Sequence, residues 1–181
     1  MLISLVGMPG GGKSTVGRQL ARRLNSPFVD SDTIVEQRIG CSIRNFFDRE
    51  GEERFRDIES AAFAELIESA SGVVATGGGL VMRAVNRNSL RDSTVCVYLR
   101  STPEELLRRL RHDTKRPLLQ VADPLARLRQ LFAQRDPLYR EASHFVIETG
   151  RPSVPTLVNM ILMQLELAGV VDPSQVQSPV D

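Results

Sequence analysis

A run of eight residues near the start of the chain has the residue types and spacing of a phosphate-binding loop. It reads Gly7-Met8-Pro9-Gly10-Gly11-Gly12-Lys13-Ser14 and matches G-x-x-x-x-G-K-[ST] at every fixed position. Glycines let backbone N–H groups point into an anion, the lysine can reach the β- and γ-phosphates, and the serine hydroxyl can ligate magnesium. The alternative is a glycine-rich turn that binds nothing. Because an apolar segment precedes the loop and a helical pattern follows it, we favour a nucleotide site.

Two carboxylates, Asp30 and Asp32, follow a second apolar segment and could serve the same reaction. P-loop enzymes usually carry an acid at the end of another strand, where it steadies the magnesium ion. Residues two apart in an extended chain share a face, so we expect both carboxylates on the loop side of the sheet. We assign Asp30 to magnesium and leave Asp32 for the phosphoryl acceptor. The alternative is a pair of solvated turn carboxylates, or a helix cap before Thr33.

A second glycine run, Gly77-Gly78-Gly79, ends a third apolar segment. Ligands of open α/β sheets gather at the carboxyl ends of strands, and glycine lets a backbone lie close to a small molecule. We therefore expect this run beside the substrate. For the run taken alone, a flexible turn is the better explanation.

Three arginines, Arg56, Arg116 and Arg135, are candidates for charge stabilisation and substrate binding. Phosphoryl transfer needs positive charge at the γ-phosphate, and a carboxylate-bearing acceptor needs forked guanidinium contacts. All but two of the 23 basic residues are arginine, so a solvated surface arginine is the default for each. The sequence does not say which arginine has which task. Arg116 lies in an irregular stretch, about 111–123, that we interpret as a lid because Pro117 prevents a regular helix there.

The elements that must position these residues follow from the apolar pattern. Five short segments rich in branched or aromatic residues are the expected strands: 2–6, 27–30, 72–76, 94–99 and 144–148. Continuous apolar runs are typical of strands buried on both faces of a parallel sheet. Helical patterns cover 14–25, 43–69, 103–112, 124–135 and 154–168, and Thr102-Pro103-Glu104-Glu105 reads as a helix start. This alternation predicts a doubly wound α/β domain with five parallel strands.

Composition and charge narrow the class of protein. The 181 residues fit one domain, which we place at 1–168 with 169–181 as a loose, flexible tail. With 41% hydrophobic and 25% charged residues, the chain is neither disordered nor fibrous, and no apolar run is long enough to span a membrane. Its 23 basic and 22 acidic residues nearly cancel, which argues against nucleic acid or a membrane surface as partner. With no leader-like segment and no paired cysteines, we expect a cytoplasmic protein.

Taken in series, these motifs resemble those of the shikimate kinase family. The motifs occur in the same order as in that family, from about residue 2 to about residue 165. It passes through the phosphate loop, Asp30-Ser31-Asp32, Gly40-Cys41-Ser42-Ile43, Phe55-Arg56 with Glu59, Gly77-Gly78-Gly79, Arg116-Pro117-Leu118-Leu119, and Arg135 with Pro137-Leu138-Tyr139. Many kinases share the phosphate loop, whereas the later set is specific. The resemblance implies a three-layer α/β/α P-loop kinase fold with sheet order 2-3-1-4-5, usually working as a monomer.

The resemblance also implies roles for individual residues. Shikimate would be held by a segment at about 31–60 and its surroundings, through Asp32, Arg56, Gly78, Gly79, Arg135, Ile43, Phe47 and Phe55. ATP would be bound by Gly10, Gly11, Gly12, Lys13, Ser14, Thr15, Arg109, Arg116 and Arg151. Lys13, Asp32 and Arg116 would be catalytic, with Asp32 accepting the proton of the attacking hydroxyl. The magnesium ion (Mg2+) would be held by Ser14 and Asp30.

The implied function is ATP-dependent phosphorylation of the 3-hydroxyl of shikimate, giving shikimate 3-phosphate and ADP on the route to chorismate and the aromatic amino acids. One alternative is another small P-loop kinase, for gluconate or nucleoside monophosphates. It would share Lys13 and Ser14 but not the later set. The other is a catalytically silent, nucleotide-binding regulatory module, which is disfavoured because no expected catalytic position is visibly lost.

Overall fold

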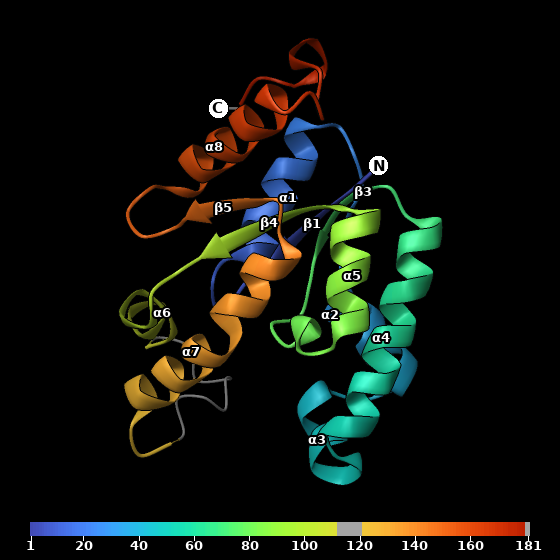
Figure 1. The fold of residues 1–181 in the computed structure, drawn as a ribbon, viewed down its shortest axis with the longest axis vertical. Coiled ribbons are helices and arrows are strands. Elements are labelled where there is room, and N and C mark those ends of the chain that lie inside the picture. Colours follow the sequence, from blue (N-terminus) through green and yellow to red (C-terminus); the bar gives the residue numbers. More distant parts are fainter. Residues whose placement is uncertain (112–120, 180–181) are drawn as a thin grey trace.

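The computed structural model describes residues 1–111 and 121–179 and has an α/β architecture (Figure 1). Its strands are β1 (Leu2–Val6), β2 (Phe28–Asp30), β3 (Gly72–Ala75), β4 (Val95–Arg100) and β5 (Phe145–Glu148). They form one parallel sheet in the order β2-β3-β1-β4-β5. The expected five-stranded parallel sheet and its order are confirmed.

The α-helices of the described part are α1 (Lys13–Arg23), α2 (Ser31–Ile39), α3 (Ile43–Glu50), α4 (Glu52–Ser69), α5 (Ala84–Ser93), α6 (Pro103–Leu110), α7 (Pro124–Ala142) and α8 (Val154–Leu167). Short 3-10 turns, η1 (Leu80–Met82) and η3 (Pro173–Gln175), complete the list. Within these residues, no helix is both long enough and apolar enough to cross a membrane.

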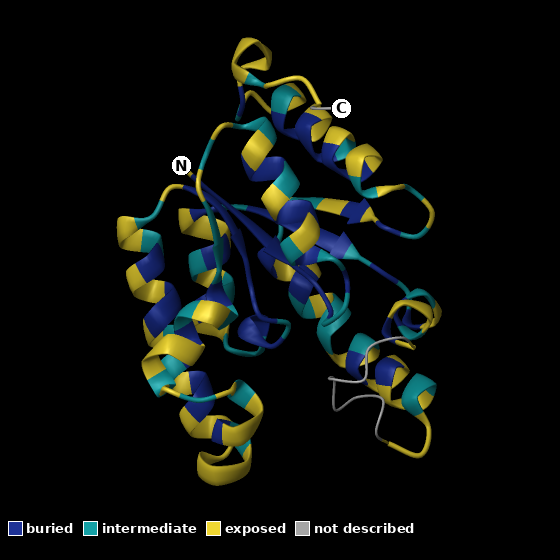
Figure 2. Ribbon diagram, turned by 180° about the vertical axis from the view of Figure 1, so that it is seen from behind, coloured by how far each residue is buried: buried dark blue, intermediate teal, exposed yellow. Residues whose placement is uncertain are grey.

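Helices cover both faces of the sheet, so the buried strands separate two cores (Figures 1 and 2). Alternate strand residues enter different cores because side chains on a strand point to opposite faces. Leu5 and Val97 pack with α1 and α8, whereas Val6 and Tyr98 pack with α4, α5, α6 and α7. A third, smaller core joins α2, α3 and α4 and contains Val35, Phe46, Phe55 and Ala62.

Several helices differ from the sequence prediction. The helices α2 and α5 were not predicted, because each buries only two side chains and so shows no apolar stripe. The predicted helix over 43–69 is two helices, since Gly51 has a φ of 85° where α3 ends and α4 begins. Helix α7 continues past Arg135 to Ala142 through Pro137, and its far end stays buried at Tyr139.

The end of the chain is packed as far as Gln177, which corrects the expectation of a loose tail from residue 169. Val171 is 9% exposed, and Val170 and Val176 pack beside it on the core of α1 and α8. The Gln177 N–H donates to the Arg23 carbonyl at 2.8 Å. The domain boundary drawn at residue 168 therefore cuts off residues that belong to this core.

Ending the chain at Gly169 should lower the free energy of unfolding by about 2–3 kcal/mol, because full burial of a valine-sized side chain contributes roughly 1.5–3 kcal/mol. Urea unfolding followed by circular dichroism measures this difference. The matched control ends at Gln177, keeps the three valines and should unfold with the wild-type midpoint. Equal stability of the two shortened chains would contradict the packing of this segment.

Candidate active site

The phosphate loop follows β1 and takes a shape that only glycine adopts easily. Gly7, Gly10 and Gly12 have φ values of 152°, 80° and 84°. A Cβ on Gly10 would lie 2.8 Å from Leu110 Cδ2, so the loop touches α6 without room for a side chain. Helix α1 starts at Lys13, within the last two residues of the loop, and its positive end therefore lies at the loop. The loop lines a cavity of about 290 Å³, together with Ser14, Thr15, Asp30, Asp32, Thr76 and Gly78.

Lys13 and Ser14 are held by polar contacts at the start of α1. The Lys13 Nζ donates to the carbonyls of Gly7 and Met8 at 2.8 and 2.9 Å. The Ser14 Oγ donates to Asp30 Oδ2 at 2.7 Å. The other Asp30 oxygen accepts from the backbone N–H of residue 32 at 3.0 Å and caps α2. The helix-cap alternative is thus confirmed for Asp30, and it leaves one oxygen for Ser14.

Asp32 reaches the cavity by a route that differs from the predicted one. Strand β2 ends at Asp30 and Asp32 lies in the first turn of α2, so the expected shared face of an extended chain is wrong. Both carboxylates nevertheless line the cavity. Burial and the charge of Asp30 raise the pKa of the Asp32 carboxyl, although Lys13 and Arg56 act in the opposite direction. A carboxylate with a raised pKa is a stronger proton acceptor.

The glycine run after β3 is a close-packed junction. The Gly77 N–H donates to Ser31 Oγ at 3.2 Å, which fixes the start of the run. A side chain on any of the three glycines would collide with a different element. The nearest atoms to an added Cβ are Asp32 Oδ1 for Gly77 (2.6 Å), Pro9 Cδ for Gly78 (2.8 Å) and the Arg56 guanidinium for Gly79.

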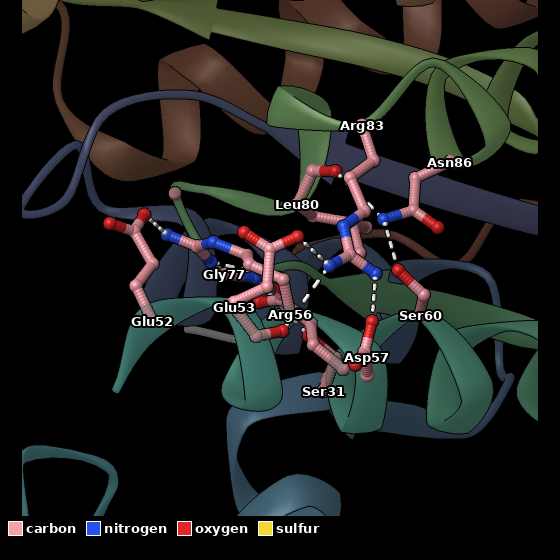
Figure 3. Close-up of polar contacts among 12 residues, drawn as sticks. Ser31, Glu52, Glu53, Arg56, Asp57, Ser60, Gly77, Leu80, Arg83 and Asn86 are labelled. Carbon is pink, nitrogen blue, oxygen red and sulfur yellow. Dashed lines mark hydrogen bonds and ion pairs between the residues drawn. The ribbon is translucent and has the colours of Figure 1, made fainter. Parts of the chain in front are cut away.

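Arg56 and Glu59 form a buried ion pair on α4, behind these glycines. They are 9% and 3% exposed, and Arg56 Nη1 lies 2.9 Å from Glu59 Oε1. Burial raises the pKa of the Glu59 carboxyl, and the charge and hydrogen bond of Arg56 oppose that rise. The more exposed Glu52 approaches Arg56 Nη2 at 3.3 Å (Figure 3).

Polar contacts tie α4 to the segment that follows the glycine run (Figure 3). Arg83 donates to Asp57 at 2.6 Å and also reaches Glu53. Asn86 donates to the Ser60 hydroxyl and to the carbonyl of residue 80, both at 3.0 Å. These contacts flank Arg56 along α4 and hold its helix against Gly79.

Arg135 comes from α7 on the other side of the junction. Its charge acts to lower the pKa of the Glu59 carboxyl and of the Tyr139 phenol, although burial raises both. The Nε atoms of Arg56 and Arg135 are buried and have no hydrogen-bond partner in the described part of the chain. A buried donor without a partner costs about 1–3 kcal/mol, so these two atoms indicate a place for an anionic ligand.

The predicted apolar wall lies beside Arg56. Phe47 and Phe55 have ring centroids 4.7 Å apart, and the Arg56 Cζ lies 5.8 and 5.3 Å from these rings. Phe55 is buried in the third core, and Ile43 and Phe47 pack against it partly buried. Their contact with a substrate stays a prediction.

The remaining predicted nucleotide residues lie farther along the sheet edge. Arg109 donates to the Ser101 hydroxyl at 3.3 Å and to the Thr149 carbonyl at 3.0 Å, which fixes it across the ends of β4 and β5. Arg151 is exposed, after β5. Arg116 and most of the predicted lid, residues 112–120, lie outside the described residues.

Two buried residues of the site, Glu59 and Tyr139, received no role from the sequence. The sequence held one signal for each, because Glu59 follows Arg56 by three positions and Tyr139 follows Arg135 by four. Side chains at these spacings meet on one helix face. The sequence does not show that Glu59 and Tyr139 are buried, and the structure does.

Comparisons with known proteins agree with this geometry. The family model described as shikimate kinase matches residues 9–166. A shikimate kinase from Paracidovorax citrulli is 59% identical over 175 residues, covering 95% of this chain and 96% of that protein. The structure of a shikimate kinase from Acinetobacter baumannii in complex with shikimate has a TM-score of 0.87 at 43% identity, covering 94% of this chain and 95% of that one. A gluconokinase from Sinorhizobium meliloti, at TM-score 0.58 and 21% identity over 92% of this chain and 91% of that one, shares the fold alone.

Asp32→Asn should stabilise the fold increasingly as the pH rises. The pKa of Asp32 is higher in the folded chain than its usual 3.8. As the pH rises, the unfolded chain therefore loses this proton at a lower pH than the folded chain does. The stability linked to that proton is complete below the unfolded pKa and is lost as the pH rises through the folded pKa. Asparagine does not titrate, so the free energy of unfolding of the variant does not fall with this proton.

Urea unfolding at a series of pH values, from about 4 to about 8, measures the difference between Asp32→Asn and wild type. Asp172→Asn is the control, because hydrogen bonds from Ser174 lower the pKa of Asp172. Its contribution is lost only as the pH falls below the usual value of 3.8, so the difference between this variant and wild type should stay constant over the measured range. An Asp32→Asn advantage that shrinks with rising pH would contradict the raised pKa.

Proposed function

Since the chain belongs to the shikimate kinase family, we propose that it transfers the γ-phosphoryl group of ATP to the 3-hydroxyl of shikimate. The products are shikimate 3-phosphate and ADP. The single observation that carries the proposal is that the phosphate loop and Asp32 line one cavity, while the buried Arg56 lies close enough for its charge to act on Asp32. A phosphate donor and an acidic acceptor thus have adjacent places.

The nucleotide half of the site is built mainly from backbone. The amides of Gly10, Gly11 and Gly12 and the start of α1 form the cradle for the β- and γ-phosphates. Lys13 donates to two carbonyls of the loop, and those donors turn to the phosphates when ATP enters. Arg109, fixed by Ser101 and Thr149, supplies a flat cation for the adenine side.

Magnesium has a suitable donor set in Ser14 and Asp30. The two oxygens lie 2.7 Å apart and line the cavity with the loop. Mg2+ takes oxygen ligands and keeps several waters and phosphate oxygens, so it needs few ligands from the protein. That fits the described residues, where no three His, Cys, Asp or Glu side chains gather as a metal site. The ion would neutralise charge on the β- and γ-phosphates.

The acceptor half of the site is built from side chains. Arg56 and Arg135 bind the shikimate carboxylate, and their unpartnered Nε–H groups supply donors for it. Gly78 and Gly79 bring backbone N–H groups to the substrate, where they pack against Pro9 and the Arg56 guanidinium. Phe47 and Phe55 cover one side of the pocket beside Arg56.

The chemical step needs a positioned hydroxyl and a proton acceptor. Asp32 hydrogen-bonds the 3-hydroxyl and takes its proton as the oxygen attacks the γ-phosphorus, while the bond to the ADP oxygen breaks. The raised pKa of Asp32 makes it a stronger base than an ordinary aspartate. Lys13 compensates the charge that moves onto the leaving oxygen. Arg116 keeps its predicted role at the transferred phosphoryl group.

Coupled ADP release with purified protein, ATP and magnesium tests the reaction. We expect release that depends on shikimate and that is absent with gluconate or nucleoside monophosphates. Lys13→Ala should abolish this release and leave the circular dichroism spectrum unchanged, since the lysine acts on the phosphates. Release with gluconate but not shikimate would move the function to the alternative acceptor. ATP binding without any release would favour the regulatory module.

Arg135→Ala should raise the KM for shikimate by about 10- to 100-fold, because a hydrogen bond to a charged group contributes about 1.5–3 kcal/mol. The KM for ATP should change little. Arg129→Ala is the matched control on the same helix, since Arg129 is exposed and pairs with Glu104. An unchanged KM for shikimate in Arg135→Ala would rule out the carboxylate contact.

A further inference from the structure

Tyr139 on α7 is fully buried, one helical turn after Arg135, and the proposed reaction gives it no task. Its Oη donates a hydrogen bond to the Gly78 carbonyl at 2.6 Å. Arg135 lies close enough for its charge to lower the pKa of the phenol, against the effect of burial. The hydroxyl therefore connects α7, one turn after Arg135, with the glycine run after β3.

The position of the Gly78 carbonyl matters because the backbone here contacts both the phosphate loop and Arg56. On one side, the missing side chain of Gly78 leaves room for Pro9 of the phosphate loop. On the other side, Gly79 lies directly against the Arg56 guanidinium. A hydrogen bond to this carbonyl thus fixes the loop where it touches both halves of the site.

The Tyr139 ring has little freedom to turn its hydroxyl elsewhere. It packs against Tyr98 with ring centroids 4.9 Å apart. The Tyr98 Oη in turn donates to Asp136 Oδ1 at 2.7 Å, beside Arg135, and Arg100 and Arg140 reach the same carboxylate at 3.1 Å. Burial also raises the pKa of the Tyr139 phenol to about 12, so the hydroxyl keeps its proton at neutral pH.

We propose that Tyr139 is a positioning residue for the acidic substrate. Its hydroxyl ties α7 to the Gly78 carbonyl and so fixes Arg135, one turn earlier on the same helix, relative to the backbone of Gly78 and Gly79. A carboxylate that binds Arg135 then meets the glycine run and Arg56 in their correct places, without first ordering them. The inference rests on the proposed function, in which Arg135 binds the shikimate carboxylate.

Tyr139→Phe tests the inference, because it removes the hydroxyl and keeps the buried ring. We expect the KM for shikimate to rise about tenfold, the effect of one hydrogen bond. The kcat and the KM for ATP should change less than about twofold, since Tyr139 does not line the phosphate cavity. A residue that only stabilises the fold would lower the unfolding midpoint and leave the KM for shikimate unchanged.

The matched control is Tyr98→Phe, which removes an equally buried hydroxyl from the stacked partner, one that contacts Asp136 instead of Gly78. It should keep the wild-type KM for shikimate. An equal rise in both variants would overturn the inference, because loosening of α7 would then explain it. An unchanged KM in Tyr139→Phe would overturn it as well.

A double-variant cycle tests whether Tyr139 acts through Arg135. In the Arg135→Ala background, Tyr139→Phe should raise the KM for shikimate no further. Full additivity of the two effects would overturn the inference. Wild-type protein serves as the reference for the function itself: without shikimate-dependent ADP release in wild type, both proposals fail. With such release and an unaffected Tyr139→Phe, only this inference fails.

Discussion

The close approach of four chain segments at Gly77, Gly78 and Gly79 is the constraint on which the site depends. Hard-sphere contact leaves no room for a Cβ at these positions, because helix α2, the phosphate loop and helix α4 each occupy one of the spaces. With any side chain there, Asp32, Pro9 or Arg56 would have to move away. The glycine run is therefore the steric condition that lets the phosphate loop, Asp32 and Arg56 lie close together.

The second feature of the site is that charged side chains are buried, which lowers the stability of the fold. Two carboxylates, Asp32 and Glu59, lie near two arginines in a space largely closed to water, and burial raises the pKa of both acids. The arginines offset part of that cost, yet each keeps a buried Nε–H without a partner. Each buried charge or unpartnered donor lowers the stability of the fold, so this cluster is a destabilising feature unless a further group pairs with it.

The sequence predicted what depends on local patterns. Short segments rich in branched and aromatic residues predicted all five strands, and the predicted helix start at Thr102 is confirmed as a reciprocal cap with Glu105. Helices α2 and α5 escaped prediction because they bury too few side chains to show a period. Asp32 was found through the wrong geometry, since the fold turns into a helix after Asp30. The junction at Gly78 and the tail valines depend on contacts between distant segments, which no spacing along the chain encodes.

The two halves of the site differ in how much a substitution within them should disturb the rest of the fold. The phosphate cradle consists of backbone attached to β1 and α1, which belong to the sheet and its main cores. The half proposed for the acceptor consists mainly of side chains from α2, α3, α4 and α7, and its aromatic residues Phe47 and Phe55 belong to a separate small core. Within the described residues, the small core shares no buried residue with the two main cores, so substitutions within it are expected to disturb the sheet less than substitutions in the phosphate loop. Acceptor specificity within this fold is therefore free to vary while phosphate binding stays fixed.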